Sequence, residues 1–103
     1  MECKGFSLKV FYNERRKFVL VCDFELLGKK FVEGHYILDV SREYYEGECA
    51  NEEEVAVQIK DADYVSLIGD QSVKLGINEG LVHKDAIVKV QGVPFAIFIN
   101  TLT

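Results

Sequence analysis

The 103-residue sequence lacks several features that would assign a class of function at once. No apolar run approaches the ~18 residues of a membrane-spanning helix, so we expect no membrane partner. The first ten residues lack the apolar stretch of a signal peptide, which favours a cytoplasmic protein. Internal repeats, linkers and low-complexity tracts are also missing, so we expect one domain over residues 1–103.

Metal-binding and disulfide patterns are missing too. Three cysteines, Cys3, Cys22 and Cys49, form an odd set without CxxC spacing, which argues against a disulfide framework and suits a reducing compartment. The two histidines, His35 and His83, lie 48 positions apart, and neither forms a helical pair with another ligand. We therefore predict no metal site.

Glycine patterns of nucleotide-binding loops are incomplete. The stretch "LLGKKF" has a single glycine before its lysines and no Ser or Thr after them. Gly69 is followed by Asp70, whose carboxylate would repel a phosphate. We predict no nucleotide site at either loop and no cofactor.

Charge, by contrast, is abundant and unevenly distributed. Residues 1–30 hold seven Lys or Arg and four Asp or Glu, whereas residues 31–63 hold two and ten, in a chain of net charge −5. We predict nucleic-acid or anion contacts at the basic residues Arg15, Arg16, Lys17, Lys29 and Lys30. Tyr12 and Phe31 flank these clusters and could stack on bases. The clusters lie at opposite ends of a strand about 15–17 Å long, so whether they form one surface stays open.

Hydrophobic periodicity predicts the strands. Alternation over residues 6–12 and an apolar run over 18–22 predict a hairpin around a polar turn at 13–17. Further strands are predicted over residues 35–40, 64–69, 86–90 and 95–99.

Capping residues predict the helices. Ser41 caps a short turn that Gly47 ends, and Asn51 with Glu54 forms a capping-box pattern at the start of a helix. Another helix begins at Asp70 and contains Gly76, where we expect close packing. The combined pattern predicts an α/β (α+β mixed) fold: a single small domain with a mixed β-sheet, an N-terminal hairpin, a strand–helix–strand crossover and about three short helices.

The stretch "VCDFELLGKKF" admits two readings. In the structural one, Asp23 caps a short helix directly after the second strand, and Gly28 ends it. In the alternative, the chain is a small enzyme with a reactive thiol at Cys22 near Asp23, assisted by a histidine. The sequence leaves enzymatic activity undecided and favours the structural reading.

Three longer stretches resemble a known family. "VCDFELLGKKFVEG", "LDVSREYYEG" and "YVSLIGDQSVKLGINEGLVHKDAIVKVQGVPFA" are similar, in order and spacing, to an archaeal family of uncharacterised proteins, the domain of unknown function 424. In the family pattern a histidine often follows Pro94, where this sequence has Phe95, so no ring nitrogen is implied there. The resemblance implies an archaeal cytoplasmic protein of one domain and no assigned activity.

We therefore expect a non-enzymatic binding or interaction module, with RNA or a translation-associated protein as its partner. A structural subunit that pairs through its last strand, residues 95–99, is a further alternative. Both a monomer and a homodimer are compatible with the sequence.

Overall fold

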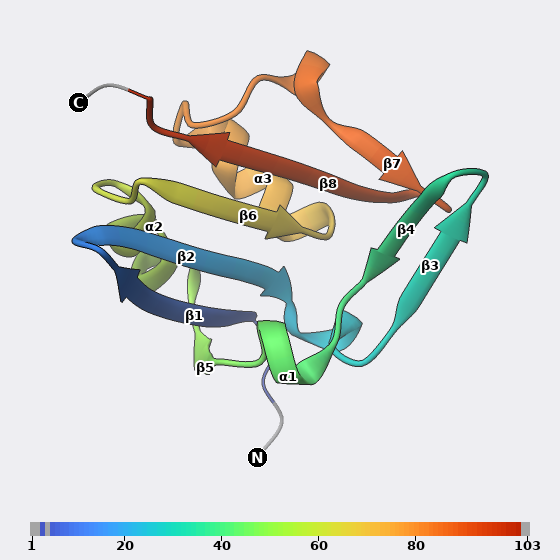
Figure 1. The fold of residues 1–103 in the computed structure, drawn as a ribbon, viewed down its shortest axis with the longest axis horizontal. Coiled ribbons are helices and arrows are strands. Elements are labelled where there is room, and N and C mark those ends of the chain that lie inside the picture. Colours follow the sequence, from blue (N-terminus) through green and yellow to red (C-terminus); the bar gives the residue numbers. More distant parts are fainter. Residues whose placement is uncertain (1–2, 4, 102–103) are drawn as a thin grey trace.

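A six-stranded mixed sheet forms the centre of the molecule in the computed structural model, which describes Cys3 and residues 5–101 (Figure 1). In the order β5-β1-β2-β6-β8-β7, its strands are β5 (Glu48–Ala50), β1 (Phe6–Asn13), β2 (Arg16–Asp23), β6 (Tyr64–Ile68), β8 (Val93–Ile99) and β7 (Val88–Val90). β2 and β6 are parallel, and the other neighbouring pairs are antiparallel. The predicted α/β class with a mixed sheet is confirmed.

The predicted N-terminal hairpin is present, with a tighter turn than expected. Asn13 pairs with Arg16, so only Glu14 and Arg15 form the turn. Their φ angles are 51° and 70°, the left-handed values that a two-residue type I′ turn requires at both positions. Asn and Gly adopt these values most readily, whereas the turn here carries two long charged side chains.

Two helices, α2 (Glu52–Ile59) and α3 (Asp70–Asn78), cover one face of the sheet. The predicted capping box starts α2: the Asn51 side chain accepts the Glu54 amide at 2.8 Å, and Glu54 accepts the Asn51 amide at 2.9 Å. The close packing expected at Gly76 is also present, because a Cβ atom there would lie 2.4 Å from Leu67 Cδ1.

The opposite face is covered at one end only. The short helix α1 (Arg42–Tyr45) and a separate two-stranded hairpin, β3 (Lys30–Glu33) and β4 (Tyr36–Asp39), pack there over a second core that contains Cys22 and Ile68 (Figure 1). Strand β3 was not predicted, because Phe31 and Val32 lie between charged residues and show no extended alternation. The hairpin tip is tied back to the main sheet, since Glu33 accepts the Gln91 amide at 2.6 Å.

The predicted strand–helix–strand unit over residues 64–90 exists with one difference. β6 and β7 run in the same direction, but β8 lies between them. Gln91 and Gly92 have φ angles of 51° and 81°, and this tight turn returns the chain so that β8 pairs with β6. The beginning of the predicted strand is instead a 3-10 turn, η2 (Lys84–Ala86). In the described part of the chain, no helix is long and apolar enough to cross a membrane.

Candidate functional site

A row of large side chains crosses four strands on the face opposite α2 and α3. Phe11 pairs with Phe18, Phe18 with Tyr64, and Tyr64 with Ile99, so the four residues are in register across β1, β2, β6 and β8. Directly paired residues point to the same side of a sheet. α1 and the β3–β4 hairpin leave the row accessible: Ile99 is 59% exposed, and the three aromatic residues are partly exposed.

The rings of this row contact one another. The Phe11 and Phe18 rings are stacked with centroids 5.1 Å apart, and the Phe18 and Tyr64 rings lie 5.6 Å apart at a tilt of 41°. The facing sides of neighbouring rings in the row are therefore in mutual contact. Ile97 is 43% exposed and stands two residues from Ile99, on the same side of β8. We call Phe11, Phe18, Tyr64, Ile97 and Ile99, together with Tyr44 of α1 (Arg42–Tyr45), the aromatic face.

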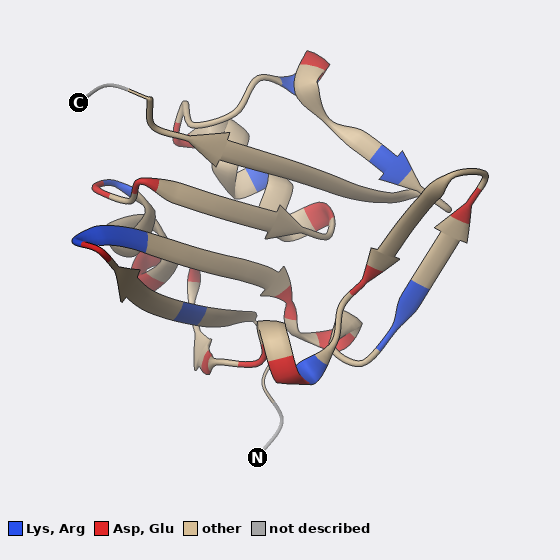
Figure 2. Cartoon of the chain, viewed as in Figure 1, with Lys and Arg blue, Asp and Glu red and all other residues tan. Residues whose placement is uncertain are grey.

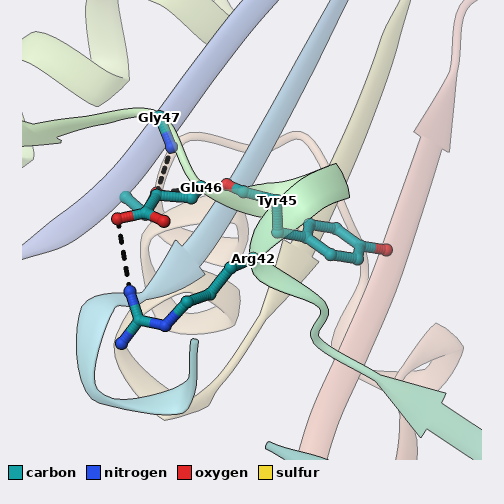
Figure 3. Close-up of polar contacts among 5 residues, drawn as sticks. Arg42, Tyr45, Glu46 and Gly47 are labelled. Carbon is teal, nitrogen blue, oxygen red and sulfur yellow. Dashed lines mark hydrogen bonds and ion pairs between the residues drawn. The ribbon is translucent and has the colours of Figure 1, made fainter. Parts of the chain in front are cut away.

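Helix α1 brings Tyr44 and Tyr45 to the border of this face. The Ser7 hydroxyl donates a hydrogen bond to the Tyr45 carbonyl at 3.1 Å and accepts one from the Gly47 amide at 2.8 Å (Figure 3). These two bonds fix the end of α1 to β1. Figure 3 shows the Tyr45 ring pointing away from the ion pair that Arg42 makes with Glu46 at 3.2 Å. The chain can approach β1 this closely because residue 47 is glycine, where a Cβ atom would lie 2.1 Å from the Leu8 carbonyl oxygen.

Lys9 and Tyr44 make a second contact between β1 and α1. The Lys9 ammonium donates to the carbonyls of Glu43 at 3.2 Å and Tyr44 at 2.9 Å, and it lies 5.8 Å from the centre of the Tyr44 ring. Tyr44 is half exposed. Burial raises the pKa of both Tyr45 and Tyr64, so these hydroxyls add no negative charge near neutral pH.

The first basic cluster is divided between the two sides of the sheet. Arg16 points to the same side as Phe18, because residues two apart on a strand share a side. Arg15 lies in the turn beside it, and neither guanidinium makes an ion pair with another described residue. Lys17 points to the helix side, where it is buried and its ammonium pairs with Asp61 at 2.6 Å.

The second basic cluster lies elsewhere, so the two clusters do not form one surface. Lys29 and Lys30 are exposed at the base of the β3–β4 hairpin, at the other end of β2 from the Arg15–Arg16 turn (Figure 2). Phe31 packs against the second core and is not a free stacking residue, whereas Tyr12 is exposed. Of the five predicted contact residues, only Arg15 and Arg16 adjoin the aromatic face.

The aromatic face is not predicted from the sequence. Phe11 interrupts the alternation of residues 6–12, so the pattern predicts no apolar surface on the polar side of this strand. The signal was nevertheless available: a turn at Glu14 and Arg15 sets Phe11 opposite Phe18. The length of the turn decides the strand register, and the sequence predicts a longer turn, over residues 13–17.

The alternative reactive site at Cys22 and Asp23 is placed unfavourably for catalysis. Cys22 has no exposed surface, and burial, with a smaller contribution from the Asp23 charge, raises its pKa to about 12. A thiol in this environment stays protonated and is a poor nucleophile. His35 is exposed in the β3–β4 turn, and the His83 ring accepts the Asp85 amide at 3.1 Å.

The structure corrects the predicted role of Asp23. Its carboxylate makes no capping bond to the 3-10 turn that follows it, η1 (Phe24–Leu26). Instead it accepts the amides of Gln71 at 3.1 Å and Ser72 at 2.8 Å, and the Ser72 hydroxyl at 2.8 Å. Asp23 therefore caps α3, a helix that begins 47 residues later in the sequence.

The sequence argues against a disulfide framework, and the structure corrects this to one disulfide. Cys3 and Cys49 form a disulfide, with their Cα atoms 5.7 Å apart, and only Cys22 is free. The bond joins the segment before β1 to the edge strand β5. An odd number of cysteines excluded complete pairing, but it did not exclude one pair.

Two further features bear on ligands. Within the described residues, no group of three or more His, Cys, Asp and Glu side chains could hold a metal ion.

An apolar groove of about 360 Å³ lies between the β3–β4 hairpin and the main sheet. Its lining residues include Tyr36, Ile37, Tyr45, Val88 and Phe95.

Comparisons with known proteins support the fold and assign no activity. A crystal structure of an uncharacterized conserved protein from Methanopyrus kandleri is similar, with a TM-score of 0.78, 19% sequence identity and 95% of each chain covered. At this identity the similarity extends to the fold alone. Among curated proteins, none matches the sequence. Residues 11–101 match the family model described as "Protein of unknown function (DUF424)".

Proposed function

This chain belongs to the DUF424 family, and we propose that it is a non-enzymatic binding module whose ligand is a single strand of nucleic acid. The observation that carries the proposal is the position of Arg16 and Arg15 beside the aromatic face. Proteins that bind single strands combine cationic side chains for the phosphates with exposed aromatic rings for the bases. A sheet face with aromatic side chains is one known platform for such binding.

Charge supports an anionic ligand at this face. On the strands, the same-side positions in and next to the row include Lys9 and Arg16 and no carboxylate, although the whole chain has a net charge of −5. Two carboxylates lie just outside the strands: Glu14 in the turn beside Arg15, and Asp63 directly before Tyr64. The ammonium of Lys9 is engaged by the carbonyls of α1, which leaves the two guanidinium groups for phosphate. An otherwise acidic molecule would thus direct an anionic strand to one end of the aromatic face.

The backbone at Arg15 is a second supporting feature. Arg15 has a φ angle of 70°, in the left-handed region where a glycine would be less strained. Residues kept in such conformations are often functional. Glu14 shares the left-handed conformation, with a φ angle of 51°, so the strain belongs to the turn as a whole; of its two side chains, the cationic one of Arg15 is the one that we assign to binding.

The aromatic contribution is expected to come mainly from the border of the face. The facing sides of the Phe11 and Phe18 rings are in mutual contact, so these sides are closed to a base. Tyr44 is 51% exposed and offers a ring beside Lys9. A translation-associated protein partner has no comparable support, since no described contact favours it.

Salt dependence of binding is the direct test. Fluorescence anisotropy with a labelled ten-nucleotide RNA, and with DNA of the same sequence, gives the affinity between 50 and 300 mM salt. Two phosphate contacts correspond to a slope of log K against log salt of about −1.4, at about −0.7 per contact. The double variant Arg15→Ala with Arg16→Ala should bring the slope close to zero. A difference between the RNA and DNA arms would show whether the 2′-hydroxyl is read.

Matched variants make the test specific. Lys29→Ala with Lys30→Ala removes the same charge at the other end of β2 and should leave the slope unchanged. Arg15→Gly should weaken binding while it relaxes the turn, so weaker binding cannot be attributed to unfolding. Tyr44→Ala should lower affinity about five-fold or more. A slope near zero in the unmodified protein, or an equal effect of the Lys29 and Lys30 changes, would reject the proposal.

A further inference from the structure

We propose that a second copy of this chain pairs with the free edge of β8, which makes the protein a two-fold symmetric dimer. β7 pairs only with residues 93–95 of β8. Residues 96–99 pair with β6 on one side, and no backbone pairing to the other side occurs within the described part of the chain. β8 is therefore an inner strand of the sheet over residues 93–95 and an edge strand over residues 96–99.

This edge lacks the protection that the other sheet edges carry. Natural edge strands are kept from pairing by charged side chains, proline or short length. β5 and β7 are three residues long and contain Glu48 and Lys89. The part of β1 beyond its pairing with β5 contains Lys9, and the hairpin strands contain Lys30, Glu33 and Asp39. Residues 96–99 have the sequence Ala-Ile-Phe-Ile, with no charge and no proline.

The same segment also exposes apolar surface. Ile97 and Ile99 are 43% and 59% exposed, and both lie on the side of the sheet that carries the aromatic face. An added strand would satisfy the free backbone groups and place apolar side chains beside these two isoleucines. The edge thus fits an uncharged, extended, apolar strand.

A second copy supplies a strand of this kind. Antiparallel pairing about a two-fold axis sets residues 96–99 of one copy against the same residues of the other, and no like charges meet because the segment has none. The rows Phe11–Phe18–Tyr64–Ile99 of both copies would then lie on one continuous sheet. This interface shares Ile97 and Ile99 with the aromatic face but does not use Arg15 or Arg16, so the two arginines test nucleic-acid binding separately from dimerisation.

Salt separates the two proposals by the sign of its effect. Each copy has a net charge of −5, so two copies repel at long range, and added salt screens this repulsion. Dimerisation through an uncharged edge should become stronger between 50 and 500 mM salt. Binding of a nucleic acid should become weaker over the same range.

Sedimentation equilibrium of the complete chain, from 5 to 500 μM, tests the dimer. We expect reversible dimerisation, and we expect Ile97→Lys or Ile99→Lys to raise its dissociation constant about ten-fold or more, because like charges then face each other. Val57→Lys is the matched control: Val57 is 66% exposed on α2, away from the edge, and its replacement should change nothing. Arg15→Ala with Arg16→Ala should also leave dimerisation unchanged.

Hydrogen exchange gives a readout that does not depend on a substitution. Amides of residues 96–99 that do not bond to β6 should exchange more slowly as the protein concentration rises. A monomer at 500 μM in 500 mM salt would overturn the proposal. A dimer that Ile97→Lys and Ile99→Lys leave intact, or that shows no concentration-dependent protection of residues 96–99, would overturn it as well.

Discussion

The Asp23 carboxylate accepts both the amide and the hydroxyl of Ser72, each at 2.8 Å, across 49 positions of sequence. The parallel pairing of β2 with β6 explains this contact. Cys22 lies opposite Ile68, so the next residues, Asp23 and Gly69, leave the two strands side by side. Gly69 is the N-cap of α3 and has no side chain, and Asp23 takes the place of the missing capping group.

Removal of this carboxylate should destabilise the fold. Asp23 is 3% exposed, and Asp23→Ala leaves the Ser72 donors buried without a partner. We expect the free energy of unfolding to fall by about 2–4 kcal/mol, from the lost cap and the unsatisfied donors. Urea unfolding followed by circular dichroism measures the change. Glu25→Gln, at an exposed position nearby, is the control and should stay within about 0.5 kcal/mol.

The same contact predicts an effect at Gly69. Its φ angle is 109°, and a Cβ atom there would lie 2.4 Å from the Asp23 Cγ atom. Gly69→Ala combines backbone strain with a clash and should cost more than about 2 kcal/mol. Gly80→Ala is the comparison variant, because Gly80 also has a positive φ, 74°, but no atom lies within 4 Å of its Cβ position. Equal losses in thermal stability for both variants would show that the clash is unimportant.

Local patterns in the sequence predicted the elements that depend on neighbouring residues. The Asn51–Glu54 capping box and the Ser41 cap involve partners three residues apart, so the spacing alone identifies them. The strand at residues 64–68 is likewise a short apolar run that ends at a glycine. These features form because the interacting groups are held close by the chain itself.

Features that join distant segments could not be predicted in the same way. The sequence predicts Asp23 as a cap of the nearest helix, whereas the parallel strand pairing brings it to the start of α3. The sequence predicts a ligand contact for Lys17, and the fold places its ammonium beside Asp61. The aromatic face requires the register of three strand pairs at once. In each case the residues are visible in the sequence, but the distant residue that each of them contacts in the fold is not.

The ion pair of Lys17 with Asp61 should make stability depend on pH. The hydrogen bond from Lys17, and then its charge, lower the pKa of Asp61 below its ordinary value of 3.8. A carboxylate whose pKa is depressed in the folded state stabilises the fold above its unfolded pKa, and this contribution is lost as the pH falls through the lowered value. Asp61→Asn should therefore be less stable than the unmodified protein at pH 7.

Chemical unfolding at pH 7, 4 and 2.5 measures this difference. The gap between the unmodified protein and Asp61→Asn should narrow steadily below pH 4. Glu79→Gln, at an exposed residue without an ion pair to a described side chain, is the control and should show no such trend. A constant gap across the three pH values would mean that the pair does not contribute through its charge.

The Cys3–Cys49 disulfide should contribute substantially to stability. It closes a loop with a sequence separation of 46, for which the chain-entropy model gives about 4 kcal/mol. Cys3→Ser with Cys49→Ser should lower the free energy of unfolding by about 2–4 kcal/mol under oxidising conditions. With a reductant present, the variant and the unmodified protein should become equal in stability. A difference that persists after reduction would show that the substitutions act through packing instead.

The free thiol of Cys22 should react slowly in the folded protein. With a pKa of about 12, roughly one thiol in ten thousand is ionised at pH 8, compared with about one in four for an unperturbed cysteine. Burial also blocks access of a reagent to the sulfur. Iodoacetamide labelling at pH 8, followed by mass spectrometry, should therefore be far slower in buffer than in 6 M guanidinium. Labelling at equal rates in both would mean that the thiolate is accessible, and it would return the enzyme alternative at Cys22 to consideration.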